Sequence, residues 1–239
     1  MLRGLSPAHP QRGEEGTKDE LVYARLFTAI IEHRLQPGMK LPEDALTESF
    51  EVSRTVIRKA LQRLALERLV TILPKRGATV AKPTIAEAKN IFAARQLIEV
   101  GTLDQVIANI RPSDIAELRE IARQEHEAQR VRDHRQAIKL SGQFHVRLLS
   151  IAGNDDLTDF LVRLVSRSSL IIAVYGSSWS ADCKCDSHDA LITLLEAGDA
   201  AQAKAWMSQH LKEVESALDM SPEEDSEPDF KKIFSEMDG

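Results

Sequence analysis

The sequence predicts a mainly α-helical protein with a winged helix-turn-helix at its amino-terminal end and an all-α antiparallel helical bundle behind it. Apolar residues recur at helical spacing through most of the 239 residues. Strand-like runs occur within residues 69–80, on either side of a basic turn. A helix with a cationic face comes directly before them. With 43% hydrophobic residues, the chain is large enough for two packed domains.

Shifts in composition divide the chain into four parts. We assign a flexible leader to residues 1–18, a winged-helix DNA-binding domain to 19–82, an all-α effector domain to 83–219 and an acidic tail to 220–239. The leader has Pro, Gly and mixed charges without periodicity. The tail is expected to be disordered and solvated; competition with DNA for the basic module is the alternative.

Charge is distributed unevenly over these parts. The formal net charge is −6, which by itself argues against a nucleic acid partner. Residues 51–82, however, hold eight basic and two acidic side chains. An acidic body with one basic module suits a protein that touches DNA at one end.

The first two helices are predicted from caps and breaks. Asp19 can cap a helix that ends near Leu35, ahead of Pro37 and Gly38. Residues 41–50 supply a second, short helix, and residues 51–52 supply the turn after it. These are the helices that precede the recognition helix in a helix-turn-helix.

The recognition helix is predicted over residues 53–64. Ser53 is a good N-cap, because its hydroxyl can accept an amide proton of the first turn. The apolar stripe expected to face the core is Val56, Ala60, Leu61 and Leu64. Arg54 and Arg58 lie one turn apart at the end that enters the major groove, where an arginine can pair with guanine. A solvated charged face is the alternative.

The wing is predicted as strand 69–73, basic turn 74–77 and strand 78–80. Lys75 and Arg76 then lie at its tip. The candidate DNA-binding residues are Ser53, Arg54, Thr55, Arg58, Lys59, Lys75, Arg76 and Gly77.

The spaced motifs at residues 35–41, 52–58, 69–70 and 74–80 resemble the GntR family of bacterial winged-helix regulators. The resemblance implies a dimer whose paired recognition helices read a pseudo-palindromic operator. Two positions depart from the family pattern, because Glu51 and Arg68 stand where glycine is common. If position 51 needs a positive φ, a side chain there costs on the order of 1 kcal/mol.

Six helices are predicted beyond the wing. Thr84 and Glu87 form a capping-box pattern that opens the first of them directly after Pro83. The expected ranges are 84–109, 113–130, 133–152, 155–174, 186–197 and 199–218.

Three histidines lie on apolar faces of these helices: His145, His188 and His210. Each one alone is expected to be an ordinary core or surface histidine. If the three converge between helices, they would form a site for Zn²⁺, Ni²⁺ or a similar divalent transition metal.

The same half resembles the ligand-sensing FCD domain of the FadR-type branch of the GntR family, through residues 144–145, 152–154, 187–192, 196–199, 207 and 210. In that domain an aspartate and three histidines commonly hold a divalent metal beneath a pocket for a small organic acid. The histidines carry over to His145, His188 and His210, but Ser141 stands where the family has the aspartate. Losing this anionic ligand is expected to weaken metal binding, unless water or an effector carboxylate completes the shell.

Four further residues are candidates for effector binding. Arg95 matches a pocket arginine of the FCD domain and could clamp a carboxylate; an ion pair with Glu99, one turn on, is the alternative. Arg167, Tyr175 and Trp179 could line the same cavity or serve only in packing. Cys183 and Cys185 are expected to be free thiols, with Cys185 also an alternative metal ligand.

The function expected from these features is a ligand-responsive transcriptional regulator, a repressor that binds operator DNA as a homodimer and releases it when a small carboxylate binds. We expect no enzymatic activity. A metal-dependent hydrolase using the three histidines is one alternative, although no His-Glu-x-x-His motif is present. An architectural DNA protein without an effector is another. With no membrane-length apolar run and no signal peptide, a cytoplasmic protein is expected.

Overall fold

The computed structural model describes residues 17–176 and 188–220. Several predictions fall outside the described residues. They concern the leader up to residue 16, most of the acidic tail, Trp179, Cys183 and Cys185.

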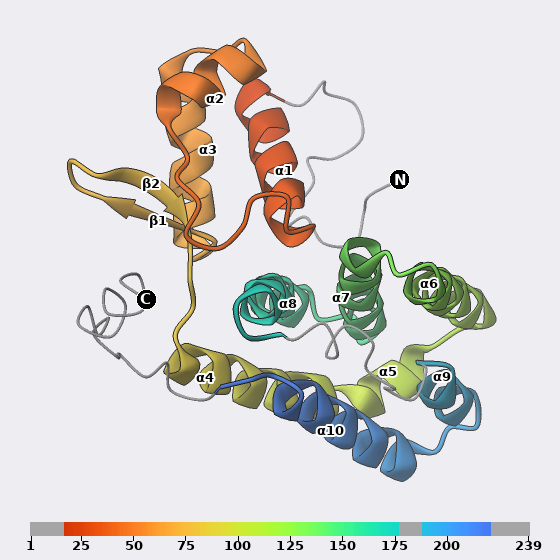
Figure 1. Ribbon diagram of the computed structural model, residues 1–239. Coiled ribbons are helices and arrows are strands. Elements are labelled where there is room, and N and C mark those ends of the chain that lie inside the picture. Colours follow the sequence, from red (N-terminus) through yellow and green to blue (C-terminus); the bar gives the residue numbers. More distant parts are fainter. Residues whose placement is uncertain (1–16, 177–187, 221–239) are drawn as a thin grey trace, which may run out of the picture.

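The amino-terminal module is a winged helix-turn-helix, as predicted. It consists of α1 (Lys18–Ile31), α2 (Glu43–Phe50), α3 (Arg54–Leu66), β1 (Val70–Leu73) and β2 (Gly77–Val80). The two strands pair antiparallel with Val70 opposite Val80 and Leu73 opposite Gly77. Figure 1 shows the hairpin projecting beside α3, away from the helical half of the molecule.

Two cap predictions need correction. The N-cap of α1 is Thr17 rather than Asp19, and the Thr17 amide donates to the carboxylate of Glu20 over 2.8 Å. Ser53 is the N-cap of α3, but its side chain makes no capping hydrogen bond. Its hydroxyl is therefore available to another partner.

The buried face of α3 also differs slightly from the prediction. Ile57, Ala60, Leu61 and Leu64 are buried, whereas Val56 is only partly covered. Val56 and Ile57 are both compatible with the helical spacing of the buried residues. Where α1 packs against α3, Ile57 is the residue that becomes buried.

The two positions where glycine was expected do adopt left-handed backbone conformations. Glu51 has φ 53° and Arg68 has φ 58°. This backbone conformation costs on the order of 1 kcal/mol for a residue with a side chain. The turn geometry of the family pattern is therefore kept without its glycines.

The second half is all helical. It consists of α4 (Ile85–Arg95), the π-helix η1 (Gln96–Val100), α5 (Leu103–Asn109), α6 (Pro112–Arg130), α7 (His134–Ser150), α8 (Asp155–Tyr175), α9 (His188–Glu196) and α10 (Ala200–Ser216). The capping box of α4 is present, with the Glu87 amide donating to Thr84 Oγ1 over 3.2 Å. In the described residues, no helix is long and apolar enough to cross a membrane.

The single helix predicted for residues 84–109 was wrong. The chain there forms α4, the π-helical turn and α5. At the end of the π-helical turn the Ile98 carbonyl accepts two hydrogen bonds from Thr102, one from the hydroxyl over 2.8 Å and one from the backbone amide over 3.2 Å. Apolar periodicity does not register such a local change of helix type.

The two modules share one apolar core. Val22, Leu26 and Leu61 of the winged module belong to the same buried cluster as Val146 and Leu161 of α7 and α8. Figure 1 shows α1 ending above α7 and α8. The winged module is therefore packed against the helical half, and residues 81–84 are not its only attachment.

Polar contacts reinforce that junction. Lys139 Nζ of α7 lies 2.7 Å from Glu32 Oε1, and both side chains are largely buried. The imidazole Nε2 of His33 lies 2.9 Å from Ser169 Oγ of α8, whose hydroxyl donates to the Ile31 carbonyl. The end of α1 is thus bound to both α7 and α8.

Candidate functional site

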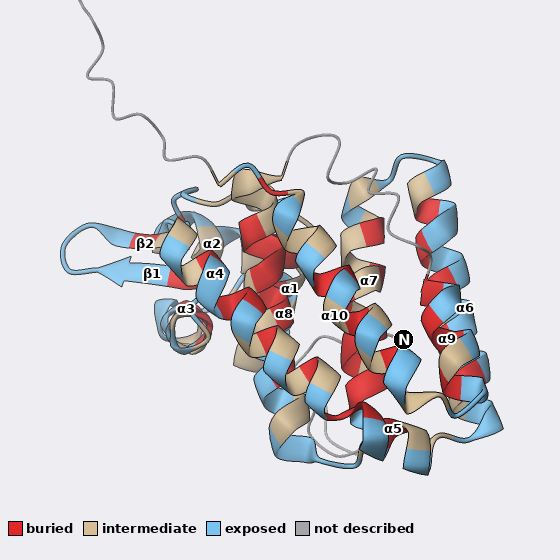
Figure 2. Ribbon diagram, turned by 90° about the horizontal axis from the view of Figure 1, so that it is seen from below, coloured by how far each residue is buried: buried red, intermediate tan, exposed pale blue. Residues whose placement is uncertain are grey.

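The predicted DNA-reading surface is open to solvent. Figure 2 shows exposed residues over most of the hairpin. The exposed candidates are Ser53, Arg54, Thr55, Arg58, Lys59, Lys75, Arg76 and Gly77. As DNA contacts these residues remain predictions.

The two arginines at the start of the recognition helix are paired with acidic residues of the first turn of α2. Arg54 Nη2 lies 2.8 Å from Asp44 Oδ1, and Arg58 Nε donates to Glu43 Oε2 over 2.8 Å. The arginine side chains remain 65% and 61% exposed. Pairs this exposed contribute about 0–1 kcal/mol, so a phosphate or a base can displace the carboxylates at little cost.

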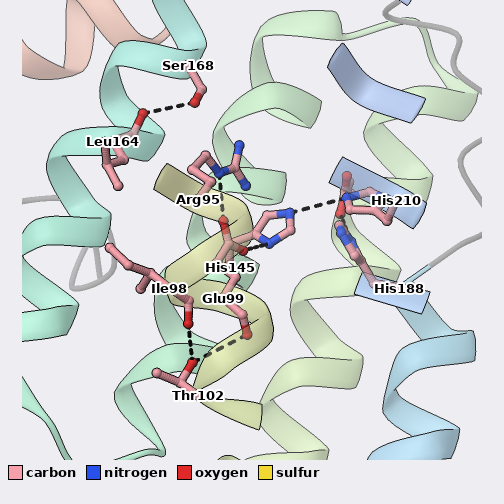
Figure 3. Close-up of polar contacts among 10 residues, drawn as sticks. Arg95, Ile98, Glu99, Thr102, His145, Leu164, Ser168, His188 and His210 are labelled. Carbon is pink, nitrogen blue, oxygen red and sulfur yellow. Dashed lines mark hydrogen bonds and ion pairs between the residues drawn. The ribbon is translucent and has the colours of Figure 1, made fainter. Parts of the chain in front are cut away.

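The three histidines converge, from three different helices. His145 lies on α7, His188 begins α9 and His210 lies on α10. One ring nitrogen of each can be chosen so that all three lie within 4.8 Å of one another, and all three side chains are buried. Figure 3 shows His145 between Glu99 on one side and His210 on the other.

Aromatic packing holds these rings in place. Phe144 stacks on His188 with 3.9 Å between ring centroids, and Trp206 stacks on His210 at 4.8 Å. His145 is set by its place on α7, next to Phe144, and its Nε2 lies 3.4 Å from Nε2 of His210. His188 and His210 are therefore each packed against one aromatic ring.

Two buried carboxylates lie behind the histidines. Glu99 Oε2 is 2.6 Å from Nδ1 of His145, at an ion-pair distance, although the alignment does not meet the geometry of a hydrogen bond. Glu125 Oε2 is 2.7 Å from Nδ1 of His188. The other oxygen of Glu99 accepts a 2.6 Å hydrogen bond from Arg95 Nε.

The electrostatics of the cluster favour neutral rings beside an ionised acid. Burial lowers the pKa of His145, and it lowers that of His210 well below its usual range. Burial by itself would raise the pKa of Glu99, but Arg95 and His145 bring it down to about 2. At neutral pH His145 and His210 therefore each keep a nitrogen lone pair.

These residues fit a transition metal ion. Imidazole nitrogen suits Zn²⁺, Ni²⁺ and related ions. Among the described residues, Nε2 of His188 is buried without a hydrogen-bond partner, and a buried nitrogen of this kind is rare unless a ligand completes it. In the described part of the chain the cluster holds the three histidines alone, so no carboxylate replaces the aspartate that Ser141 stands in for.

The effector candidates are placed differently. Arg95 is buried and forms an ion pair with Glu99, as the alternative interpretation of its role predicted. Arg167 lies 3.3 Å from Glu87 at the start of α4, and the Tyr175 hydroxyl donates to the Pro83 carbonyl. Among these three, Arg95 alone makes contact with the histidine cluster, through Glu99. As effector-binding residues all three remain predictions.

Sequence reasoning missed the roles of Glu99 and Glu125 at the histidines. One signal was present, because Glu125 continues the buried stripe of α6 formed by Ile115, Leu118 and Ala122. A carboxylate on an apolar stripe needs a buried partner. Glu99 gave no comparable signal, since its position depends on the π-helical turn.

Comparison with known proteins decides the family. The model of bacterial regulatory proteins of the gntR family matches residues 18–80, and the FCD domain model matches residues 90–213. The chain belongs to the GntR family and carries an FCD domain. It is a transcriptional regulator rather than an enzyme, so the hydrolase alternative is set aside.

Relatives agree over most of the chain. It is 28% identical over 204 residues to an HTH-type transcriptional regulator of Streptomyces ambofaciens, covering 81% of each chain. It is 25% identical to the transcriptional repressor RspR of Escherichia coli, covering 87% of this chain and 92% of that protein.

Solved structures share the fold. A putative GntR regulator from Rhodococcus has a TM-score of 0.72 at 21% identity, over 84% of this chain and 97% of that one. McbR/YncC of E. coli has a TM-score of 0.74 at 20% identity, over 82% and 94%. GntR regulators bind operator DNA and small-molecule effectors.

Proposed function

We propose that this regulator is a dimeric repressor that reads its operator through Arg54 and Arg58 and responds to a small organic acid at a metal centre formed by His145, His188 and His210. The convergence of the three buried imidazoles carries the ligand-sensing half of this proposal. The exposed cationic end of α3 supports the DNA-reading half.

The bound metal would act as a Lewis acid that anchors a carboxylate oxygen of the effector. The chain's own residues hold the histidines and exclude water, through the stacked rings of Phe144 and Trp206. An arginine fork suits a second contact to a carboxylate. Arg95 is the candidate nearest the histidines, and to use it an effector would have to compete with Glu99.

The route from effector to DNA runs along α7. This helix carries His145 in the cluster and Lys139 in the contact with α1. A shift of α7 on effector binding would alter how the winged module is held. An effector switches the regulator only if its affinity differs between the DNA-competent and incompetent arrangements.

The DNA half is tested with Arg58→Ala. We expect sequence-specific operator binding, measured by fluorescence anisotropy, to be lost while the thermal unfolding of the protein is unchanged. Arg123→Ala is the matched control, because it removes the same charge from the exposed face of α6. Retained operator affinity in Arg58→Ala would contradict the assignment of α3.

The metal half is tested by elemental analysis of purified protein. We expect near-stoichiometric transition metal in the wild-type protein, and its loss in the double variant His145→Ala, His188→Ala. Absence of metal from the wild-type protein, even after incubation with Zn²⁺ or Ni²⁺ and desalting, would remove the metal centre from the proposal.

A further inference from the structure

We infer that Glu99 and Glu125 are positioning residues for the histidine cluster: each fixes the Nδ1–H tautomer of one histidine, His145 or His188, and so leaves its Nε2 lone pair free to bind a cation. The metal-binding consequence rests on the proposed metal centre. The tautomers themselves do not, since the metal-free protein is expected to have them.

The argument begins with the two short contacts. A carboxylate ion only accepts hydrogen bonds, so the nitrogen facing it must carry the proton. Nδ1 of His188 is hydrogen-bonded to Glu125 over 2.7 Å. Nδ1 of His145 lies at an ion-pair distance of 2.6 Å from Glu99, which places the acceptor oxygen on the same side of that ring. A neutral imidazole has one N–H, and placing it on Nδ1 leaves Nε2 as an acceptor.

The opposite side of each ring agrees with this assignment. Among residues 17–176 and 188–220, Nε2 of His188 is buried and has no hydrogen-bond partner. Nε2 of His145 faces Nε2 of His210 at 3.4 Å. Both unprotonated nitrogens therefore point into the cluster, while both N–H groups point away from it.

The two carboxylates also supply negative charge near the site. Ser141 stands where the family has its acidic ligand, so none of the three residues in the cluster is an anion. Carboxylates hydrogen-bonded behind metal-bound imidazoles raise the basicity of the ligands. Here Glu99 and Glu125 would offset the missing charge by acting through His145 and His188.

Glu99 and Glu125 are not equivalent. In the described residues Glu125 pairs with His188 alone, whereas Glu99 also binds Arg95, which offsets its charge. Removing the charge of Glu125 should therefore weaken metal binding more than removing that of Glu99. Glu125 is also the cleaner test, because its removal leaves no buried arginine unpaired.

His210 is held in another way. Within the part of the chain that the structure describes, its Nδ1 is buried and has no hydrogen-bond partner. Its ring stacks on Trp206 at an angle of 11°. Gln96 donates to the Ser208 carbonyl of α10 over 2.7 Å. The π-helical turn, which also carries Glu99, is thereby bound to the helix that carries His210.

The tautomers are tested in metal-free protein, prepared with EDTA and labelled with ¹⁵N, by long-range ¹H–¹⁵N correlation spectra of the imidazoles. We expect Nδ1–H for His145 and His188 in the wild-type protein. Glu125→Gln keeps a carbonyl acceptor and should keep this tautomer of His188; Glu125→Ala should lose it. An Nε2–H tautomer of His188 in the wild-type protein, or no change in a folded Glu125→Ala, would overturn the inference.

Metal affinity is measured with Zn²⁺ alone, in competition with a chromophoric chelator. Removal of such a partner typically weakens metal binding 10–100-fold, and we expect a loss of about that size for Glu125→Ala, with Glu125→Gln intermediate. Glu120→Gln is the control, because it neutralises an exposed carboxylate on the same helix.

The outcomes separate the two claims. A wild-type protein that binds no Zn²⁺ sinks the proposed metal centre and the affinity consequence with it, and the imidazole spectra then decide the tautomers alone. If the wild-type protein and folded Glu125→Ala bind Zn²⁺ with the same affinity, the metal centre is supported and the positioning role of Glu125 is overturned. Folding of each variant is checked by circular dichroism.

Discussion

One arginine–carboxylate pair lies at the start of the recognition helix and another lies behind the histidine cluster. The two pairs have similar N–O distances, but their side chains differ in exposure. The Arg54–Asp44 side chains are 65% and 75% exposed, whereas those of Arg95 and Glu99 are 5% and 3% exposed. Water screens the first pair and solvates either partner when they separate. A buried charge that loses its partner has no such replacement. Arg54 can therefore exchange its carboxylate for another anion, as the proposed contact with DNA requires, while Arg95 is held in place.

The junction between the modules lies between these extremes. Lys139 and Glu32 are 14% and 13% exposed. The loss of unfolding free energy on breaking a pair is therefore expected to be largest for Arg95–Glu99, smaller for Lys139–Glu32 and smallest for Arg54–Asp44.

The largest effect is expected for Arg95→Met. Glu99 would lose the buried cation that offsets its burial, so we expect the free energy of unfolding to fall by about 3–5 kcal/mol. Urea denaturation of the metal-free protein measures this. Arg123→Met, on an exposed face, is the control. A loss below about 1 kcal/mol would show that Glu99 is satisfied without the guanidinium.

A smaller effect is expected for Lys139→Met. The substitution removes a charged hydrogen bond of 2.7 Å, and Glu32 keeps its bond to Arg34. We expect a loss of about 1.5–3 kcal/mol in the same assay. Limited proteolysis should also become faster in residues 81–84, because α1 is held less firmly on α7. Unchanged cleavage would argue that the apolar core alone docks the winged module.

The same ion pair predicts a pH dependence. Burial by itself would raise the pKa of Glu32, but its bonds to Lys139 and Arg34 lower it below the reference value of 4.5. A lowered carboxyl pKa stabilises the fold above the unfolded-state value, and the contribution is lost as pH falls through the folded-state pKa. Between pH 6 and 3, stability should therefore decrease less in Lys139→Met than in the wild-type protein. Parallel curves would contradict the role of Lys139.

The smallest effect is expected for Asp44→Asn. Because the pair is exposed, the free energy of unfolding should change by less than about 0.5 kcal/mol. Removing a negative charge next to Arg54 should leave operator affinity unchanged or slightly higher, measured by anisotropy at fixed salt. A clear loss of affinity would instead mean that Asp44 holds Arg54 in its reading position.

Local features were predictable wherever short-range chemistry sets them. The wing strands, the Thr84 capping box and the helices around residues 112–175 follow from caps, breaks and apolar spacing, and each is found within a few residues of its predicted position. The errors occur at the cap of α1, where Thr17 and Glu20 form the capping box, and in the π-helical turn, which apolar periodicity does not register.

The sequence by itself determined most of the helices and their apolar faces, and that exposed cations gather on α3 and the wing, because these properties depend on neighbours within a turn or a hairpin. Tertiary structure alone decided that α7, α9 and α10 bring three distant histidines together, that Glu99 and Glu125 lie behind them, and that the winged module shares a core with α7 and α8. The physical reason is that such contacts depend on how helices pack across the fold, and periodicity along one helix carries no information about its partner.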